Sequence, residues 1–179
     1  MNNITLGDKK FVQYILASDI DKALTCMAAQ IDEDYKNDKP VFIITLNGAI
    51  FFAVELLKKL KIDTYITSIR LSSYEGTSST SKIKEIMGLQ EDLTGKRVII
   101  LEDIVDTGKT YEHILHLLEK ENVKDIRIAT LTFKPEAYNK PYPVHYIGFS
   151  IPNKFIVGHG LDYDGRGRNL CDIYQIIDN

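Results

Sequence analysis

The sequence predicts an α/β fold in which a central, mostly parallel, twisted sheet is flanked by helices. Two segments, residues 41–60 and 98–118, support this prediction because each joins a fully apolar strand pattern to a helix pattern through a short turn. Strands without polar alternation are typical of parallel sheets that helices cover on both faces. The chain has 179 residues and no visible internal repeat, so we expect a single domain over residues 1–179.

The first predicted helix begins near Ser18 or Asp19, either of which can cap its N-terminus. Its apolar stripe consists of Ile20, Leu24, Ala28 and Ile31. Pro40 then introduces a strand over Val41–Leu46, and Gly48 opens a second helix. The residues expected to face inward from this helix are Ile50, Ala53, Val54, Leu57 and Leu60.

A third strand is expected over about residues 64–71. The run that follows is too polar to bury and too long for a tight turn, so we predict a flexible lid loop over about residues 71–82. Later strands are expected over residues 126–133, 144–151 and 155–157, with a proline-interrupted loop over 134–143. Right-handed crossovers gather the carboxyl ends of parallel strands at one edge of the sheet. The loops expected to converge there begin at Asn47, Ser72, Glu102 and Lys134.

The segment 98–110, VIILEDIVDTGKT, is the most informative part of the chain. An apolar strand is followed by a turn and by a helix from about Thr107, whose inward residues are Tyr111, Ile114, Leu115 and Leu118. Free backbone N–H groups and the positive end of the dipole favour a dianion at a helix N-terminus. The hydroxyls of Thr107 and Thr110 add donors, and Gly108 allows close approach to the backbone. The turn therefore predicts a phosphate site.

Three carboxylates surround this turn: Glu102, Asp103 and Asp106. They argue against a P-loop for nucleoside triphosphates, which needs glycine where Asp103 stands and would suffer repulsion from the carboxylates. Carboxylates instead suit a ribose diol or a divalent cation. Because side chains alternate along a strand, Glu102 and Asp103 should point to opposite sides. We expect at least one to reach the sugar hydroxyls and the other to act through metal or water.

The bulk properties exclude several partners. A net charge of -3 and a pI near 5.8 give no global attraction to nucleic acid or to an anionic membrane. Residues 1–10 lack a signal-peptide core, and no apolar run approaches the roughly 20 residues that span a bilayer, so a cytoplasmic location is expected. Cys26 and Cys171 have no C-x-x-C partner and are expected to be reduced, in or near the core.

Five ordered segments carry a resemblance to a known family: 46–49, 73–74, 102–110, Lys134 and 153–163. From about residue 5 onward the chain resembles the hypoxanthine and hypoxanthine-guanine phosphoribosyltransferases, type I enzymes of purine salvage that use 5-phosphoribosyl-1-pyrophosphate (PRPP). The resemblance implies a small hood formed by terminal segments, including about residues 150–179, and a homodimer or homotetramer. The residues it assigns to the ribose and 5′-phosphate of PRPP are Glu102, Asp103, Asp106, Thr107, Gly108, Lys109 and Thr110.

The resemblance places the pyrophosphate-binding loop at Leu46, Asn47 and Gly48, with a cis peptide between the first two residues. Many relatives have lysine at the position of Asn47, so backbone N–H groups are expected to bind pyrophosphate here. Ser73 and Tyr74 correspond to a Ser-Tyr pair on the family's closing flap, also at the pyrophosphate. Closure would exclude water from an oxocarbenium-like sugar.

The resemblance also assigns the base site. Lys134 would read the exocyclic oxygen of a 6-oxopurine, because an ammonium group only donates hydrogen bonds and so selects a carbonyl over the amino group of adenine. Phe155 would stack on the purine, and the backbone around Ile156 would bind its pyrimidine edge. His159 lies close to these residues in sequence and receives no role.

Magnesium is the implied cofactor, with Glu102, Asp103 and Asp162 as the expected ligands. Asp162 would hold a second magnesium against pyrophosphate, which Arg168 would also contact. Asp106 is the expected catalytic acid/base, because it lies between the phosphate turn and the base site.

The predicted reaction transfers the 5-phosphoribosyl group from PRPP to hypoxanthine, and to guanine, with IMP or GMP and pyrophosphate as products. One alternative is a phosphoribosyltransferase for xanthine or another base. Others are an RNA-binding regulator on the same scaffold, against which the scattered lysines and acidic balance weigh, and a module that binds PRPP without turnover.

Overall fold

The computed structural model describes residues 2–74, 82–89 and 91–177. Within them, the main sheet has six strands in the order β5-β4-β3-β6-β7-β8. Their bounds are β3 (Val41–Leu46), β4 (Tyr65–Tyr74), β5 (Lys82–Met87), β6 (Arg97–Val105), β7 (Asp125–Phe133) and β8 (Tyr146–Ser150). All neighbours pair in parallel except β4 and β5. The predicted α/β class with a mostly parallel sheet is confirmed.

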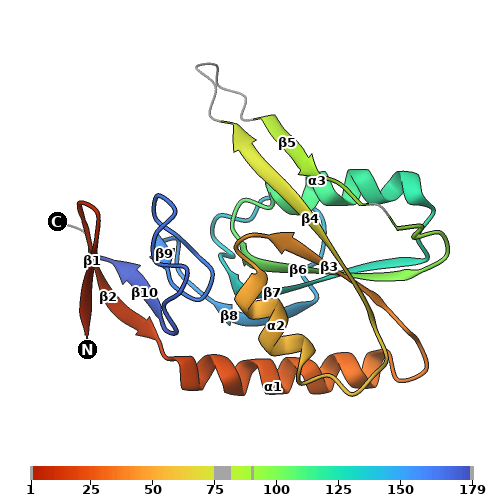
Figure 1. Ribbon diagram of the computed structural model, residues 1–179, viewed down its shortest axis with the longest axis horizontal. Coiled ribbons are helices and arrows are strands. Elements are labelled where there is room, and N and C mark those ends of the chain that lie inside the picture. Colours follow the sequence, from red (N-terminus) through yellow and green to blue (C-terminus); the bar gives the residue numbers. More distant parts are fainter. Residues whose placement is uncertain (1, 75–81, 90, 178–179) are drawn as a thin grey trace.

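Helices cover both faces of this sheet (Figure 1). α1 (Ala17–Asp34) and α2 (Ile50–Leu57) lie on one face, and α3 (Lys109–Leu118), with the short η1 (Glu119–Glu121), lies on the other. On β6, Ile99 and Leu101 belong to the core under α1 and α2, whereas Val98 and Ile100 belong to the core under α3. Alternate residues of one strand thus fill both cores, which explains the unbroken apolar run.

A second, smaller sheet is built from both ends of the chain. Its antiparallel order is β1-β2-β10-β9, with the bounds β1 (Asn3–Leu6), β2 (Lys9–Ile15), β9 (Ile156–Val157) and β10 (Ile173–Ile176). Phe11, Val157 and Tyr174 form its small core. The sheet lies at one end of the main sheet, beside the amino end of α1 (Figure 1).

The predicted capping of α1 is wrong. The helix begins at Ala17, so neither Ser18 nor Asp19 stands at its cap. The backbone N–H of Ala17 instead donates to Asp172 Oδ1 at 2.7 Å, from 155 positions away along the chain. Asp172 Oδ2 accepts a second hydrogen bond, from Gln13 Nε2, at 2.7 Å. The terminal segment thereby caps α1 and ties the small sheet to it.

The predicted inner face of α2 is partly wrong. Ile50 and Val54 are 38% and 50% exposed, while the buried residues are Phe52, Ala53 and Leu56. Seven of the eight residues of this helix are apolar, so no polar face marks which side turns outward. Packing against α1 and the sheet makes that choice.

The predicted loop conformation is wrong over residues 71–74, because β4 continues to Tyr74 and pairs antiparallel with β5. The role of the segment as a lid stays a prediction. An edge hairpin tolerates the polar residues that argued against a strand. Residues 75–81 of the predicted lid lie outside the described residues.

Cys26 and Cys171 are exposed, which corrects the prediction that they lie in or near the core. In the described part of the chain, the helices are too short or too polar to cross a membrane.

Candidate active site

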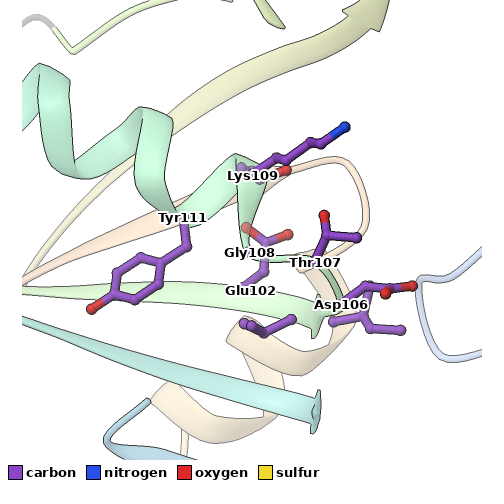
Figure 2. Close-up of a pocket in the computed structure, with 9 residues that line it drawn as sticks. Glu102, Asp106, Thr107, Gly108, Lys109 and Tyr111 are labelled. Atoms are coloured by element: carbon purple, nitrogen blue, oxygen red, sulfur yellow. The ribbon is translucent and has the colours of Figure 1, made fainter. Parts of the chain in front are cut away.

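A cavity of about 150 Å³ opens where β6 ends and α3 begins (Figure 2). It is lined by Glu102, Ile104, Val105, Asp106, Thr107, Gly108, Lys109, Thr110 and Tyr111. Six of the seven residues that the resemblance assigns to the ribose and 5′-phosphate of PRPP therefore line one cavity; Asp103 is the exception. Gly108 is the N-cap residue of α3, with φ 79°, and a side chain there would overlap the ring of Tyr138.

The helix begins at Lys109, two residues later than expected, so residues 106–108 form a loop in front of it. The first N–H groups of a helix have no intrahelical acceptor and point toward such a loop. Thr107 is exposed, and the Lys109 side chain extends away from the loop (Figure 2). The backbone N–H groups at the start of α3 can therefore supply positive potential to the cavity, as helix N-termini do at anion sites.

Glu102 and Asp103 are buried at the end of β6, with 7% and 8% exposure. Glu102 points toward the loop before α3 (Figure 2), and Asp103 lies against Gly48. The two carboxyl groups nevertheless interact with each other, so the predicted orientation to opposite sides does not separate them. Burial, and then the neighbouring charge of Asp103, raise the pKa of Glu102 well above its ordinary value of 4.5. Burial also raises the pKa of Asp103, against the opposing effects of its hydrogen bonds with Glu102 and with the backbone N–H of Ile104 and, least, of the charge of Arg168. The Glu102 Oε2 atom has no hydrogen-bond partner.

This raised pKa predicts how stability depends on pH. Between the unfolded value near 4.5 and the higher folded value, the folded protein binds more protons than the unfolded chain, so the free energy of unfolding falls as pH rises. Replacing Glu102 by Gln removes the charge, and the variant should be more stable than wild type by about 1–3 kcal/mol at pH 8. Urea unfolding of the metal-free protein at several pH values measures the difference.

The advantage of Glu102→Gln should shrink as the pH falls below about 4.5, where the wild-type carboxyl becomes protonated in both the folded and the unfolded state. Glu119→Gln, an exposed substitution on η1, is the matched control and should change stability little at either pH. A Glu102→Gln variant that is less stable than wild type at pH 8 would contradict an uncompensated charge at this position.

The turn after β3 lies directly against the acidic pair. The Leu46-Asn47 peptide is cis, as the resemblance implies. A side chain at Gly48 would overlap the Asp103 carboxylate, and one at Gly160 would overlap the carbonyl oxygen of Gly48. Two loops and the end of β6, all distant in sequence, are therefore in van der Waals contact, with no space for a Cβ atom at either glycine.

Arg168 joins this group from the C-terminal segment. Its Nη1 donates to the carbonyl oxygen of Gly160 at 2.7 Å, and its Nη2 lies 2.7 Å from Asp162 Oδ1. The other oxygen of Asp162 accepts the N–H of Gly165 at 2.7 Å. Among the described residues, no three His, Cys, Asp or Glu side chains meet in a metal-binding group. Asp162 is thus not in one cluster with Glu102 and Asp103.

Lys134 forms the contact that the sequence did not predict. Its ammonium group lies 2.7 Å from Asp106 Oδ2, and the lysine is 6% exposed. The backbone N–H of Lys134 donates to Val105 O at 2.9 Å, so the ends of β6 and β7 hold both residues. The expected acid/base group and the expected base-reading group are therefore a salt-bridged pair next to the cavity at the start of α3.

Phe155 and Ile156 differ in their surroundings. Phe155 is 44% exposed and contacts Tyr163 edge to face, with ring centroids 6.0 Å apart. Ile156 is 5% exposed and pairs with Gln175 in the small sheet. An accessible aromatic face at the sheet's border is suited to stacking on a planar base.

Ser73 and Tyr74 belong to β4, paired with Ile83 and Lys82. The predicted pyrophosphate contacts of their side chains lie outside the described part of the structure.

Sequence reasoning missed two residues that shape this site. Gly160 has φ 102° and abuts Gly48. The order Gly158, His159, Gly160 just after a short strand was a usable signal, since isolated glycines often mark a close approach of the backbone. Tyr138 covers Gly108 from 30 positions further along the chain, and no local pattern announces that contact.

The model of the phosphoribosyl transferase domain family matches residues 15–164 of the chain. The hypoxanthine phosphoribosyltransferase of Buchnera aphidicola subsp. Schizaphis graminum is 37% identical over 166 residues, covering 91% of this chain and 94% of the relative. The hypoxanthine-guanine phosphoribosyltransferase of Mycobacterium bovis is 35% identical over 174 residues, covering 93% and 86%. Among solved structures, a hypoxanthine-guanine phosphoribosyltransferase of Bacillus anthracis superposes with a TM-score of 0.88 at 32% identity, covering 93% of this chain and 98% of that one.

Proposed function

The chain belongs to the phosphoribosyltransferase family, and from this premise we propose that it is a purine-salvage enzyme acting on hypoxanthine and guanine. It transfers the 5-phosphoribosyl group of PRPP to the base, giving IMP or GMP and pyrophosphate. One observation supports the choice of base most directly: the buried Lys134 ammonium, 2.7 Å from Asp106 beside the phosphate cavity. A buried donor without acceptor capacity favours the oxygen of a 6-oxopurine over the amino group of adenine.

In the proposed reaction the loop before α3 holds the 5′-phosphate through backbone N–H groups, with the hydroxyls of Thr107 and Thr110 as further donors. Lys109 belongs to the same phosphate-binding segment through its backbone. The sugar is thereby anchored next to Asp106. The base lies between Lys134 and the ring of Phe155, with the backbone at Ile156 along its edge.

The bond changes occur at the anomeric carbon of the sugar. Its bond to the pyrophosphate oxygen breaks, and the electron pair leaves with pyrophosphate. Ring nitrogen 9 of the purine attacks the same carbon, and the proton of the imidazole ring passes to Asp106. Leu46, Asn47, Gly48, Ser73, Tyr74 and Arg168 make up the proposed pyrophosphate site.

The acidic pair fits a divalent cation, and magnesium is part of the proposal. Burial leaves Glu102 Oε2 without a partner and raises the pKa of that carboxyl, a cost that a bound cation would offset. Glu102 and Asp103 would hold one ion, and Asp162 a second. When bound, magnesium neutralises charge on the phosphates of PRPP.

The proposal also assigns the parts of the chain. Residues 1–179 form one domain in which the lid at about 71–82 closes over the sugar and the hood, including about 150–179, binds the base. In the same proposal, the protein is a homodimer or homotetramer in the cytoplasm and has no nucleic-acid or membrane partner.

Steady-state kinetics with hypoxanthine, guanine, xanthine and adenine, each with PRPP and magnesium, test the function. We expect hypoxanthine to be used best and adenine at least roughly 100-fold less well in kcat/KM, because adenine would place its amino donor against the Lys134 ammonium, which cannot accept a hydrogen bond. A preference for adenine would overturn the assignment of Lys134. Binding of PRPP without turnover of any base would identify a sensor instead.

Lys134→Gln is the informative variant in this assay. An amide both donates and accepts, so the discrimination against adenine should fall by about tenfold or more while use of PRPP persists. Lys154→Gln, at an exposed position next to Phe155, is the control and should leave the order of the bases unchanged.

A further inference from the structure

His159 lies between the pyrophosphate turn and the C-terminal segment, yet the reaction above gives it no part. It is 3% exposed, with φ 50°. Its Nδ1 lies 3.3 Å from the carbonyl oxygen of Cys171. Because a carbonyl oxygen only accepts, Nδ1 carries the hydrogen in this contact. The ring is thereby oriented, and its Nε2 atom points at another element.

That element is α2. His159 Nε2 lies 3.6 Å from Glu55 Oε2, and the imidazole packs at 6.3 Å from the ring of Phe51. Glu55 and Phe51 are one turn apart on the same helix, so both contacts fall on one face of α2. The Nε2 atom is buried and has no hydrogen-bond partner, so its contact with Glu55 is one of close packing. His159 is thus the side chain that joins the loop over residues 158–161 to this helix.

The same loop makes a second contact with the turn that starts α2. Gly160, the next residue after His159, abuts the carbonyl oxygen of Gly48. Arg168 binds that part of the loop through the carbonyl oxygen of Gly160, at 2.7 Å. The loop is therefore attached to α2 at two points, through Gly160 at the turn and through His159 further along the helix. Two attachments to one rigid element fix both the position and the orientation of the loop.

We propose that His159 is a positioning residue for the pyrophosphate site, holding Gly160, Asp162 and Arg168 in place against the Asn47-Gly48 turn. The inference rests on the proposed function, since it assigns that turn to pyrophosphate. Its consequence is selective. Loss of the contact with α2 should lower the affinity for PRPP and for pyrophosphate, while the base site, centred on Lys134, stays intact.

Two substitutions separate the contacts of the ring. Asparagine accepts a positive φ and keeps a donor near the position of Nδ1, but it does not reach α2. Glutamine reaches as far as Nε2. We expect His159→Asn to raise KM for PRPP roughly tenfold, with kcat and KM for hypoxanthine within about threefold of wild type. His159→Gln should recover most of the PRPP affinity, and Glu55→Ala, which removes the side chain that Nε2 faces, should reproduce a smaller part of the loss.

Calorimetric titration with PRPP and magnesium, without a base, provides a readout that does not need turnover. If the wild type binds PRPP but converts no purine base, the proposed function fails while the role of His159 can still be measured. Leu24→Ala, in the α1 core, is the control for general destabilisation. The inference is overturned if His159→Asn binds PRPP with an affinity within twofold of wild type. It is also overturned if the affinities for PRPP and for hypoxanthine fall together, as general destabilisation is expected to make them fall in Leu24→Ala.

Discussion

Replacing Asp106 by Asn should lower turnover by roughly 100-fold or more, the usual worth of general-base assistance. In the wild-type protein the Lys134 ammonium lies 2.7 Å from the Asp106 carboxylate. Asparagine has the same shape, and its amide oxygen can still accept a hydrogen bond from that ammonium. It cannot take a proton from the purine. The loss should therefore appear in kcat at saturating PRPP and hypoxanthine, with a much smaller change in the affinity for PRPP.

Single-turnover measurements at saturating substrates separate the chemical step from product release. Asp164→Asn, an exposed change of the same chemistry in the C-terminal segment, is the control and should leave kcat within about twofold. Because Lys134 is 6% exposed, the folded state of Asp106→Asn needs a check by thermal unfolding. Unchanged turnover in a folded Asp106→Asn variant would remove this residue from the mechanism.

Replacing Gly160 by Ala should both destabilise the fold and disable PRPP binding. A Cβ atom there overlaps the carbonyl oxygen of Gly48, which belongs to backbone and cannot rotate away. The φ of 102° adds strain for any residue with a side chain. We expect the free energy of unfolding to fall by more than about 2 kcal/mol. Displacement of the turn should lower kcat/KM for PRPP by about 100-fold.

Gly165→Ala separates the two causes of that loss. Gly165 also has a positive φ, of 75°, but a Cβ atom there meets no neighbour within 4 Å. This control should cost about 1 kcal/mol of backbone strain and leave kcat/KM for PRPP within about threefold. If the two variants behave alike, the contact between Gly160 and Gly48 does not hold the pyrophosphate turn.

Local patterns were sufficient for much of this protein. The apolar run 98–101 predicted a strand buried on both faces, and the structure places alternate residues in the two cores. The same segment predicted a turn and a helix N-terminus, and the cavity forms there. Strand and helix periods are properties of neighbouring residues, and a phosphate turn is a continuous stretch of backbone, so both can be inferred without knowing the rest of the fold.

Local patterns failed where packing chooses between equivalent options. α2 is apolar on nearly every side, so its sequence does not say that Phe52 turns inward and Val54 outward. Asp19 is a good capping residue by type, yet Asp172 caps α1 because the small sheet brings it to the helix start. In both cases the deciding energy comes from residues distant in the chain.

The contacts between loops depended wholly on the tertiary structure. Lys134 meets Asp106, and Gly160 meets Gly48, because parallel strands and the terminal sheet bring their loops to one edge. Such pairs cannot be predicted from local sequence, because the residues around one partner carry no information about the other partner. Residue types thus indicated a phosphate and carboxylate chemistry, and the family resemblance added the base site. The distances at which these groups can act together come from strand order and close packing.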